Sequence, residues 1–334
     1  MSLQARVHPA ISPEMGRSNI SPELQDLADL PRLVERMRAG ERRAISRAVT
    51  ELERLSAAAP ALLLAMRPYL GHAIVIGVTG PPGAGKSTLL NAYTRHLRAE
   101  AKSVGIIAVD PSSPISGGAI LGDRIRMTAA LDDDGVFMRS LASRGHLGGL
   151  TPAAVRVIDA LDAAGKDVIL IETVGTGQTD LDVAEVADVR IVVTAPGLGD
   201  DIQAMKAGLI EIADILVVNK ADREGAVQTA QQLQGALSLK SGVRAAVPVL
   251  KVAATTGEGV DVLAAAIEEV IAGSATPPLV RRRRRARYLI ARAAADLVAE
   301  RIRKETGRVA DALADEVLAG TLLPAQAAKK LIDG

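Results

Sequence analysis

The chain has 334 residues, of which 48% are hydrophobic and only 1% are aromatic. Its 40 Lys and Arg residues nearly cancel its 39 Asp and Glu residues, so the charge gives no general attraction to nucleic acid or to anionic membranes. The absence of cysteine excludes disulfide bonds and thiolate metal sites, and no apolar run approaches the roughly 20 residues that cross a bilayer. We therefore expect a cytoplasmic protein that binds neither nucleic acid nor membranes.

The N-terminal part of the chain is predicted to be helical after a short lead-in. Residues 1–20 mix Pro, Ser and Gly with isolated apolar positions, which is typical of a disordered segment. Residues 21–70 then form an N-terminal helical extension. Its first helix has apolar residues on one face, at Leu24, Leu27, Leu30, Val34 and Met37. Gly40 separates this helix from a second one, predicted over residues 42–58.

Residues 71–276 alternate short β-branched runs with helical patterns. The predicted strands are 74–78, 104–109, 168–171, 189–193, 215–218 and 247–252. Apolar runs of this length between helices indicate an α/β fold with a mainly parallel sheet and helices on both faces. Pro277-Pro278 ends this region, and residues 277–334 are predicted to form a mostly helical tail.

A phosphate-binding loop follows the first predicted strand. Its sequence is Gly80-Pro81-Pro82-Gly83-Ala84-Gly85-Lys86-Ser87, followed by Thr88 at the start of a helix. This matches G-x-x-x-x-G-K-S/T in the strand–loop–helix context that the motif needs, because loop N–H groups and the helix N-terminus then surround phosphate. We expect Lys86 to contact the β- and γ-phosphates and the Ser87 hydroxyl to bind Mg²⁺. The fold is therefore predicted to be a P-loop NTPase.

A guanine-recognition motif, Asn219-Lys220-Ala221-Asp222, ends the fifth predicted strand. The Asp222 carboxylate can accept hydrogen bonds from guanine N1–H and N2–H₂, which adenine does not offer, so GTP and GDP are predicted rather than ATP. Asn219 and the stem of Lys220 are expected to tie this turn to the phosphate loop. A further contact, to guanine O6, is expected from the loop at Ala253, Ala254 and Thr255.

Acidic residues at two strand ends, and a third in a Gly-rich segment, predict a magnesium site. Glu172 begins an E-x-x-G motif, whose Gly175 N–H is expected to sense the γ-phosphate. Asp110 ends the second predicted strand, and Asp123 lies in the segment Gly122-Asp123-Arg124. Carboxylates suit Mg²⁺ and can orient a water molecule. The predicted metal ligands are Ser87, Asp110, Asp123 and Glu172, and the predicted catalytic residues are Lys86, Asp123 and Glu172.

Hydrolysis by this site is expected to be slow without help. Thr176 follows Gly175, where Ras-like GTPases carry a Gln that positions water. A partner that accelerates turnover is therefore expected.

Four segments together resemble the MeaB/ArgK family, whose human relative is the methylmalonic aciduria type A protein. They are GPPGAGKST, VDPSSPISGGAILGDRIRM, IETVGTGQTD and NKAD. The resemblance runs from about Pro22 to the C-terminus and is densest between Gly77 and Asp222. It implies a SIMIBI-class G domain over residues 71–276, with N-terminal helices and a C-terminal dimerisation arm over residues 277–334. The chain is therefore expected to form a homodimer.

The resemblance also implies a function. It implies a GTP-dependent chaperone of adenosylcobalamin-dependent methylmalonyl-CoA mutase, which gates cofactor loading and protects the mutase from inactivation. By the same resemblance, Lys86, Ser87, Asp110, Asp123 and Glu172 fall on the phosphate and Mg²⁺ site. Gln178 falls in a switch that responds to the mutase.

Two other functions remain open at this point. The first is a SIMIBI GTPase that serves another metalloenzyme, although a nickel-delivery role needs Cys or His ligands, and the four His residues are scattered. The second is a transport-associated ATPase or kinase, which Asn219 and Asp222 oppose. The Arg281–Arg285 run could bind nucleic acid, but charge runs are usually solvated helix faces, and an amphipathic dimer arm is the preferred interpretation.

Overall fold

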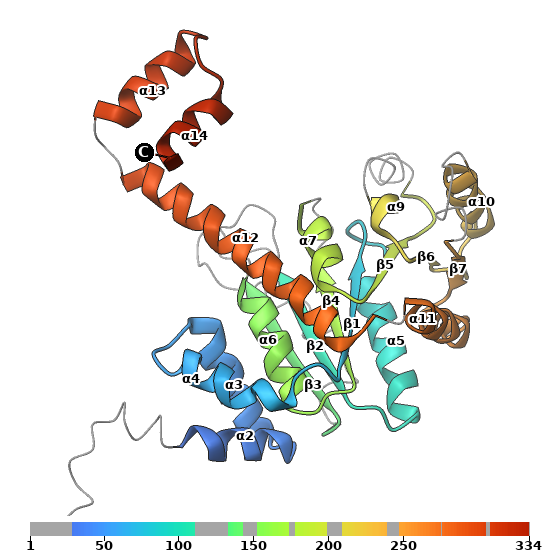
Figure 1. Cartoon of the computed structure of the whole chain (residues 1–334). Coiled ribbons are helices and arrows are strands. Elements are labelled where there is room, and N and C mark those ends of the chain that lie inside the picture. Colours follow the sequence, from blue (N-terminus) through green and yellow to red (C-terminus); the bar gives the residue numbers. More distant parts are fainter. Residues whose placement is uncertain are drawn as a thin grey trace, which may run out of the picture.

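The structure is a computed structural model that describes residues 29–110, 133–142, 152–173, 178–198, 209–238, 247–274, 276–304 and 308–333. The expected lead-in, residues 1–20, lies outside the described residues. In the described part the chain forms a seven-stranded sheet in the order β3-β2-β4-β1-β5-β6-β7 (Figure 1). Every pairing is parallel. The strands are β1 Ile74–Thr79, β2 Val104–Asp110, β3 Val136–Ala142, β4 Val168–Thr173, β5 Val189–Thr194, β6 Ile215–Asn219 and β7 Val249–Val252.

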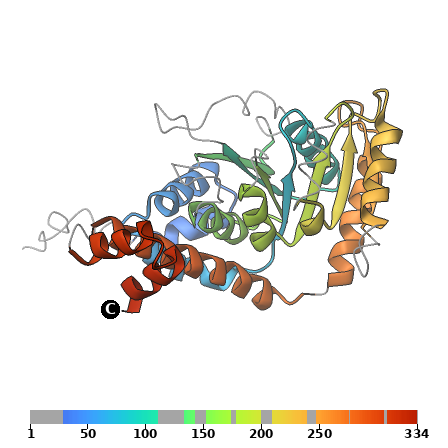
Figure 2. The ribbon, with the colours of Figure 1, turned by 90° about the horizontal axis from the view of Figure 1, so that it is seen from above.

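Helices cover both faces of this sheet, which confirms the predicted fold class (Figure 2). The helices between or after the strands are α5 Lys86–Ala99, α6 Pro152–Ala163, α7 Gln178–Val186, α9 Leu209–Ile212, α10 Ala226–Ser238 and α11 Val260–Ser274. Alternate strand residues point to opposite faces, so Val75 and Ile169 join the core formed with α6 and α7. Their neighbours Ile76 and Leu170 join the core formed with α5 and α11.

The edge strand β3 is absent from the strands that the sequence predicts. Its sequence, VFMRSLA, contains one β-branched residue and an arginine, so it lacks the continuous apolar run of the other strands. An edge strand needs less apolar surface because it pairs on one side only, here with β2. Arg139 uses this position to pair with Glu53 of the N-terminal helices.

Within the described residues before β1, the chain forms three helices and a 3₁₀ turn. They are α2 Leu30–Arg38, α3 Arg42–Arg54, α4 Ala59–Met66 and η1 Arg67–Tyr69. Helix α3 is shorter than the predicted helix at residues 42–58, because Leu55 adopts a left-handed conformation with φ 49° and ends it. The apolar face at Leu30, Val34 and Met37 is buried, as predicted, in the core that contains α6.

A buried carboxylate on α6 fixes the approach to β1. Asp162 accepts hydrogen bonds from the backbone N–H groups of Gly71, His72 and Ala73, at 2.5, 3.0 and 2.9 Å. These donors precede the strand and have no ladder partner there, so the carboxylate satisfies groups that would be costly to leave unpaired. The start of the central strand is thereby set by a side chain 89 to 91 residues away.

The C-terminal part consists of α12 Pro278–Lys304, α13 Arg308–Leu318 and α14 Pro324–Asp333. Helix α12 packs against α6 and α7 near its start, while α13 and α14 pack together at its far end (Figures 1 and 2). Among the described residues, no single helix is long and apolar enough to cross a membrane. Helices α11 and α12 meet that criterion only as a pair, with a bend of 94° between them.

The arginine run of α12 surrounds a single buried carboxylate. Arg281, Arg284 and Arg285 lie 3.3, 3.1 and 2.8 Å from the Asp188 carboxylate, whose side chain is only 7% exposed. Burial lowers the pKa of Arg285, and Asp188 opposes that effect. The expectation of a solvated face is therefore wrong for these three arginines.

The C-terminal end of α7 supplies further hydrogen-bond acceptors for these arginines. Helix α7 ends at Val186, where the last carbonyl groups lack intrahelical partners. Arg285 Nε donates to Val186 O at 3.0 Å, and Arg284 Nη2 donates to Ala187 O at 2.6 Å. Cations also interact favourably with a helix C-terminus. The start of α12 is thus held by both the end of α7 and Asp188.

We predict that Asp188→Asn lowers the free energy of unfolding by about 3 kcal/mol, because it leaves three clustered guanidinium groups without their carboxylate. Urea unfolding followed by circular dichroism measures this change. Glu41→Gln is the matched control, since it also removes a carboxylate paired with an arginine, but at the exposed Arg36–Glu41 pair. No measurable change is expected there. Equal effects of the two substitutions would contradict a structural role for Asp188.

Candidate functional site

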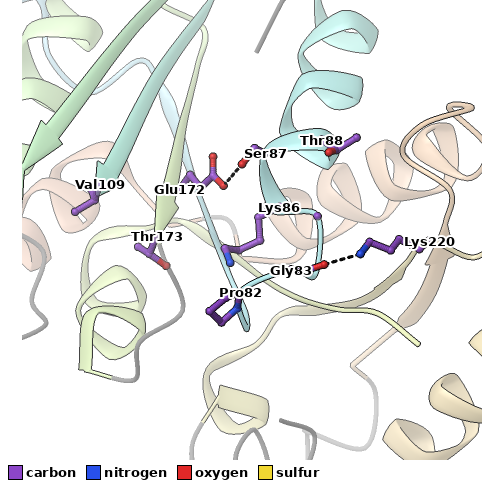
Figure 3. Close-up of a pocket in the computed structure, with 10 residues that line it drawn as sticks. Pro82, Gly83, Lys86, Ser87, Thr88, Val109, Glu172, Thr173 and Lys220 are labelled. Atoms are coloured by element: carbon purple, nitrogen blue, oxygen red, sulfur yellow. Dashed lines mark hydrogen bonds between the residues drawn. The ribbon is translucent and has the colours of Figure 1, made fainter. Parts of the chain in front are cut away.

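A cavity of about 380 Å³ opens at the carboxyl edge of the sheet (Figure 3). It is lined by Pro82, Gly83, Gly85, Lys86, Ser87, Thr88, Val109, Glu172, Thr173 and Lys220. These residues come from the loop after β1, the start of α5, the ends of β2 and β4, and the turn after β6. Ligands of open α/β sheets bind at this edge because the loops after parallel strands converge there.

The loop between β1 and α5 has a backbone that requires glycine at two positions. Gly80 has φ +138°, and a Cβ at this position would lie 1.9 Å from the carbonyl oxygen of Val193 in β5. Gly85 has φ +87°, and its Cβ would lie 2.4 Å from Asn219 Nδ2. A side chain at either position would push the loop away from its neighbours. The glycines therefore hold the loop against β5 and against the turn after β6.

Lys86 places a cation inside this loop. Its Nζ donates hydrogen bonds to Gly80 O at 2.8 Å and to Pro81 O at 3.0 Å, and the residue is 6% exposed. The ammonium group is therefore held beside the cavity by the loop itself. Phosphate oxygens are stronger acceptors for an ammonium group than carbonyl oxygens are. The loop, the cation and the N-terminus of α5 together form an anion-binding arrangement.

Ser87 and Glu172 bring two oxygen ligands together beside Lys86. Ser87 Oγ donates to Glu172 Oε1 at 2.6 Å, and both residues are buried (Figure 3). A hydroxyl and a carboxylate are hard oxygen ligands of the kind that Mg²⁺ prefers, so the pair fits this ion. No group of three or more His, Cys, Asp or Glu side chains able to hold a metal occurs among the described residues. Any remaining ligands would be water, phosphate, or residues outside that part.

Asn219 connects three loops through one buried amide. Its Nδ2 donates to Ala84 O at 2.9 Å and to Gly85 O at 3.1 Å, while its Oδ1 accepts from Ala254 N–H at 3.2 Å. Lys220 Nζ donates to Gly83 O at 2.7 Å. Asn219 and Lys220 therefore tie the turn after β6 to the phosphate loop, as the sequence predicts.

The remaining residues predicted to recognise guanine lie beside these ties. Asp222 is exposed in the turn after β6, and the next loop contains buried Ala253 and Ala254 and exposed Thr255. Ala221 N–H donates to Val252 O at 3.1 Å, so the two loops are held side by side. The turn that contains Asp222 and the loop at Ala253–Thr255 are therefore neighbours, and Lys220 of that turn lines the phosphate-binding cavity.

Several predicted site residues cannot be placed. Asp123 and Gly175 lie outside the described residues, as do the side chains of Asp110 and Gln178. In contrast, Val109 and Thr173 line the cavity although they were not among the predicted site residues. Thr173 donates to Thr79 Oγ1 at 3.0 Å and so joins the ends of β4 and β1. Val109 is the last residue of a predicted strand, and Thr173 lies in the E-x-x-G motif two residues after another, so these positions were the available signal.

A family model described as "Methylmalonyl Co-A mutase-associated GTPase MeaB" matches residues 43–308. This chain belongs to the MeaB family. It is therefore a GTPase that binds GTP and GDP, and the cavity at the phosphate loop has the composition that such a site needs.

Relatives and a solved structure agree with this assignment. A Pyrococcus horikoshii protein named as a GTPase is 50% identical over 241 residues, which are 71% of this chain and 76% of that protein. The mitochondrial methylmalonic aciduria type A homolog of Mus musculus is 37% identical over 190 residues, 55% of this chain and 46% of its own. A crystal structure of LAO/AO transport system kinase has a TM-score of 0.72 at 28% identity, covering 95% of this MeaB-family chain and 99% of that one.

We predict that Glu172→Gln lowers GTP turnover roughly 10- to 100-fold and raises the Mg²⁺ concentration needed for half-maximal turnover, because the site loses a buried negative charge. Steady-state phosphate release across a Mg²⁺ titration measures both effects. Glu268→Gln is the control, since that carboxylate is exposed and pairs with Lys102 away from the cavity. Wild-type turnover and Mg²⁺ dependence in Glu172→Gln would remove Glu172 from the site.

Proposed function

We propose that this chain is a Mg²⁺-dependent GTPase that acts as a chaperone of adenosylcobalamin-dependent methylmalonyl-CoA mutase, gating cofactor loading and protecting the mutase. The observation that carries the proposal is the family match over residues 43–308, whose description names association with that mutase. The name of the mouse relative, which refers to methylmalonic aciduria, supports the same client. The description of a similar structure as a transport system kinase is a statement about that protein.

The roles proposed for the site residues are those that the sequence motifs predict. Gly80–Thr88 bind the phosphates, with Lys86 neutralising charge on the β- and γ-phosphates as the bond to the γ-phosphate breaks. Ser87 and Glu172 would hold Mg²⁺, which would supply further positive charge at the phosphates. Asp110 and Asp123 complete the proposed metal ligands, and Glu172 and Asp123 are proposed to orient the attacking water. Gly175 is proposed to sense the γ-phosphate.

Guanine is proposed to bind over the stem of Lys220. Asp222 accepts hydrogen bonds from the base, and the loop at Ala253–Thr255 supplies a backbone N–H to the guanine carbonyl oxygen. Because Asn219 already bonds both to the phosphate loop and to Ala254 N–H, base and phosphate sites are set at a fixed separation. A preformed site of this kind binds nucleotide without first ordering these loops.

Communication with the client is proposed to run through α7. This helix begins at Gln178, close in sequence to the end of β4 at Thr173, which lines the cavity. A client that binds one arrangement of this segment more tightly must shift nucleotide affinity, because the coupling of two binding equilibria is reciprocal. Gln178 is therefore the proposed point at which the mutase acts on the site.

Residues 71–276 are proposed as the G domain, with an extension at residues 21–70 and a dimerisation arm at residues 277–334. The arm exposes large apolar side chains along its length, at Ile290, Leu297, Val309, Leu318, Leu323 and Ile332. Apolar surface of this extent is typical of a protein–protein interface. A second copy of the chain is the proposed partner of this surface.

The dimer is tested by truncation after Lys304, which removes α13 and α14 but keeps the arginines around Asp188. We predict that the full chain sediments as a dimer and that the truncated chain sediments as a folded monomer that still binds GDP. Truncation after Pro277 is the comparison, and it is expected to destabilise the fold because Asp188 loses all three arginines. A full chain that is monomeric at micromolar concentration would refute the proposal.

The client is tested with a variant of this chain whose nucleotide specificity is changed. Asp222→Asn is expected to exchange GTP for xanthosine triphosphate as the preferred substrate, because the amide can donate to the extra carbonyl of xanthine. We predict that the mutase raises turnover of GTP by the wild type, and of xanthosine triphosphate by Asp222→Asn, by roughly tenfold or more. Steady-state phosphate release with and without mutase measures this.

The Asp222→Asn variant distinguishes stimulation of this chain from the activity of a contaminating GTPase. If mutase raises GTP hydrolysis equally in the wild type and in Asp222→Asn, the activity comes from another protein. Glu224→Gln, an exposed acid in the same turn, should keep the wild-type preference. Absence of stimulation, with no mutase complex on gel filtration in either nucleotide state, would leave a GTPase with a different client.

A further inference from the structure

A second cavity is lined by residues of α7 and α12, two helices that pack against each other and are labelled in Figure 1. Its volume is about 770 Å³, within the range of small-molecule pockets, and it shares no lining residue with the nucleotide cavity. The α12 lining residues recur every three or four positions from Val280 to Arg292, which places them on one face of the helix. We call this cavity the α7–α12 groove.

The α7–α12 groove carries an excess of positive charge. Arg283, Arg284, Arg287 and Arg292 line it, against two carboxylates on α7, so the formal net charge of the lining is +2. One of those carboxylates, Asp182, is engaged in a hydrogen bond with the Tyr288 side chain. The other, Glu185, is exposed. The groove therefore attracts anions.

Two of its arginines are available for a ligand. Arg283 and Arg287 are exposed, lie one helical turn apart, and have neither a hydrogen bond nor an ion pair within the described ranges. Side chains four residues apart on a helix face the same way and can grip one anion together. Arg281 and Arg285, in contrast, are committed to Asp188.

Two further guanidinium groups have buried N–H donors to spare. Nε of Arg284 and Nε of Arg292 are buried and have no hydrogen-bond acceptor in the part of the chain that the structure describes. Arg284 is held in place by its Nη2 bonds to Ala187 O and Asp188 Oδ1. A buried donor without an acceptor is unfavourable, so an oxygen-rich ligand that accepts from these two donors would stabilise the protein.

The rest of the lining is suited to an apolar or aromatic group. Val280 is 49% exposed although it is apolar, and Tyr288, about two helical turns further along α12, lines the same groove at 7% exposure. Burial raises the pKa of Tyr288, so its phenol remains protonated and donates to Asp182. A simple inorganic anion would leave this apolar surface uncovered.

We propose that the α7–α12 groove binds an organic phosphate, with the phosphate on the arginines of α12 and the organic part over Val280 and Tyr288. Guanidinium groups match phosphate oxygens in pairs, which makes arginine well suited to this ligand class. The site is separate from the GTP site and needs no contact with a client protein.

The proposal is tested with 1-naphthyl phosphate as a fluorescent probe. The chain contains no tryptophan, so the protein contributes only tyrosine fluorescence to the background of the naphthyl signal. The full chain is first saturated with GDP and Mg²⁺, which fills the phosphate loop. The fluorescence anisotropy of the probe is expected to rise on binding, and Arg287→Ala is expected to weaken binding about tenfold, the loss of one charge-assisted contact. Arg283→Ala combined with Arg287→Ala should abolish it.

The controls distinguish the groove from other surfaces. Arg95→Ala removes an exposed arginine of α5 and should leave probe binding unchanged. GDP affinity should be unchanged in all variants, which shows that they are folded. 1-Naphthol, which lacks the phosphate, should not bind, and inorganic phosphate should compete only weakly. No binding of the probe, or binding that Arg283→Ala with Arg287→Ala leaves intact, would overturn the proposal.

Discussion

The buried side-chain amide of Asn219 holds the nucleotide site in one arrangement. It donates to Ala84 O and Gly85 O and accepts from Ala254 N–H, so three loops that are distant in sequence meet at one group. At 1% exposure the amide has no water to replace these partners. The tight approach of Gly85 to the same amide shows that there is no space to spare. The phosphate loop is therefore shaped by the turn after β6, which is proposed to bind the base.

Two carboxylates at the amino edge of the sheet, opposite the nucleotide cavity, fix the start of the strand that leads into the phosphate loop. Asp162 accepts hydrogen bonds from the backbone N–H groups that precede β1. Asp188 accepts a hydrogen bond from Val75 N–H at 3.0 Å, near the start of the strand. Strand β1 lies at the centre of the sheet, between β4 and β5, and leads directly into Gly80. Since Asp188 is also the centre of the arginine cluster of α12, the C-terminal helix and the central strand share one anchor.

Sequence reasoning recovered those features that are encoded locally. Strands β1, β4 and β6, the phosphate loop and the ties from Asn219 and Lys220 follow from contiguous patterns of apolar and glycine residues and from a motif of four residues. Strand β3 was missed because it pairs on one side only and carries Arg139. The inward position of the arginine run was missed because its partner Asp188 is a single acid 93 to 97 residues away. Neither charge spacing nor periodicity encodes such a distant pairing.

The sequence separation between Asp188 and its arginines has a consequence for synthesis of the chain. Arg285 follows Asp188 by 97 residues, so at about 5–20 residues per second it leaves the ribosome about 5–20 s later. Strands β6 and β7 and helix α11 are made in that interval. A nascent chain can therefore complete its sheet while the acid at the base of β5 still lacks all three cations. A chain released before α12 is made would contain the phosphate loop and strands β1 to β7, but Asp188 would lack its three arginines.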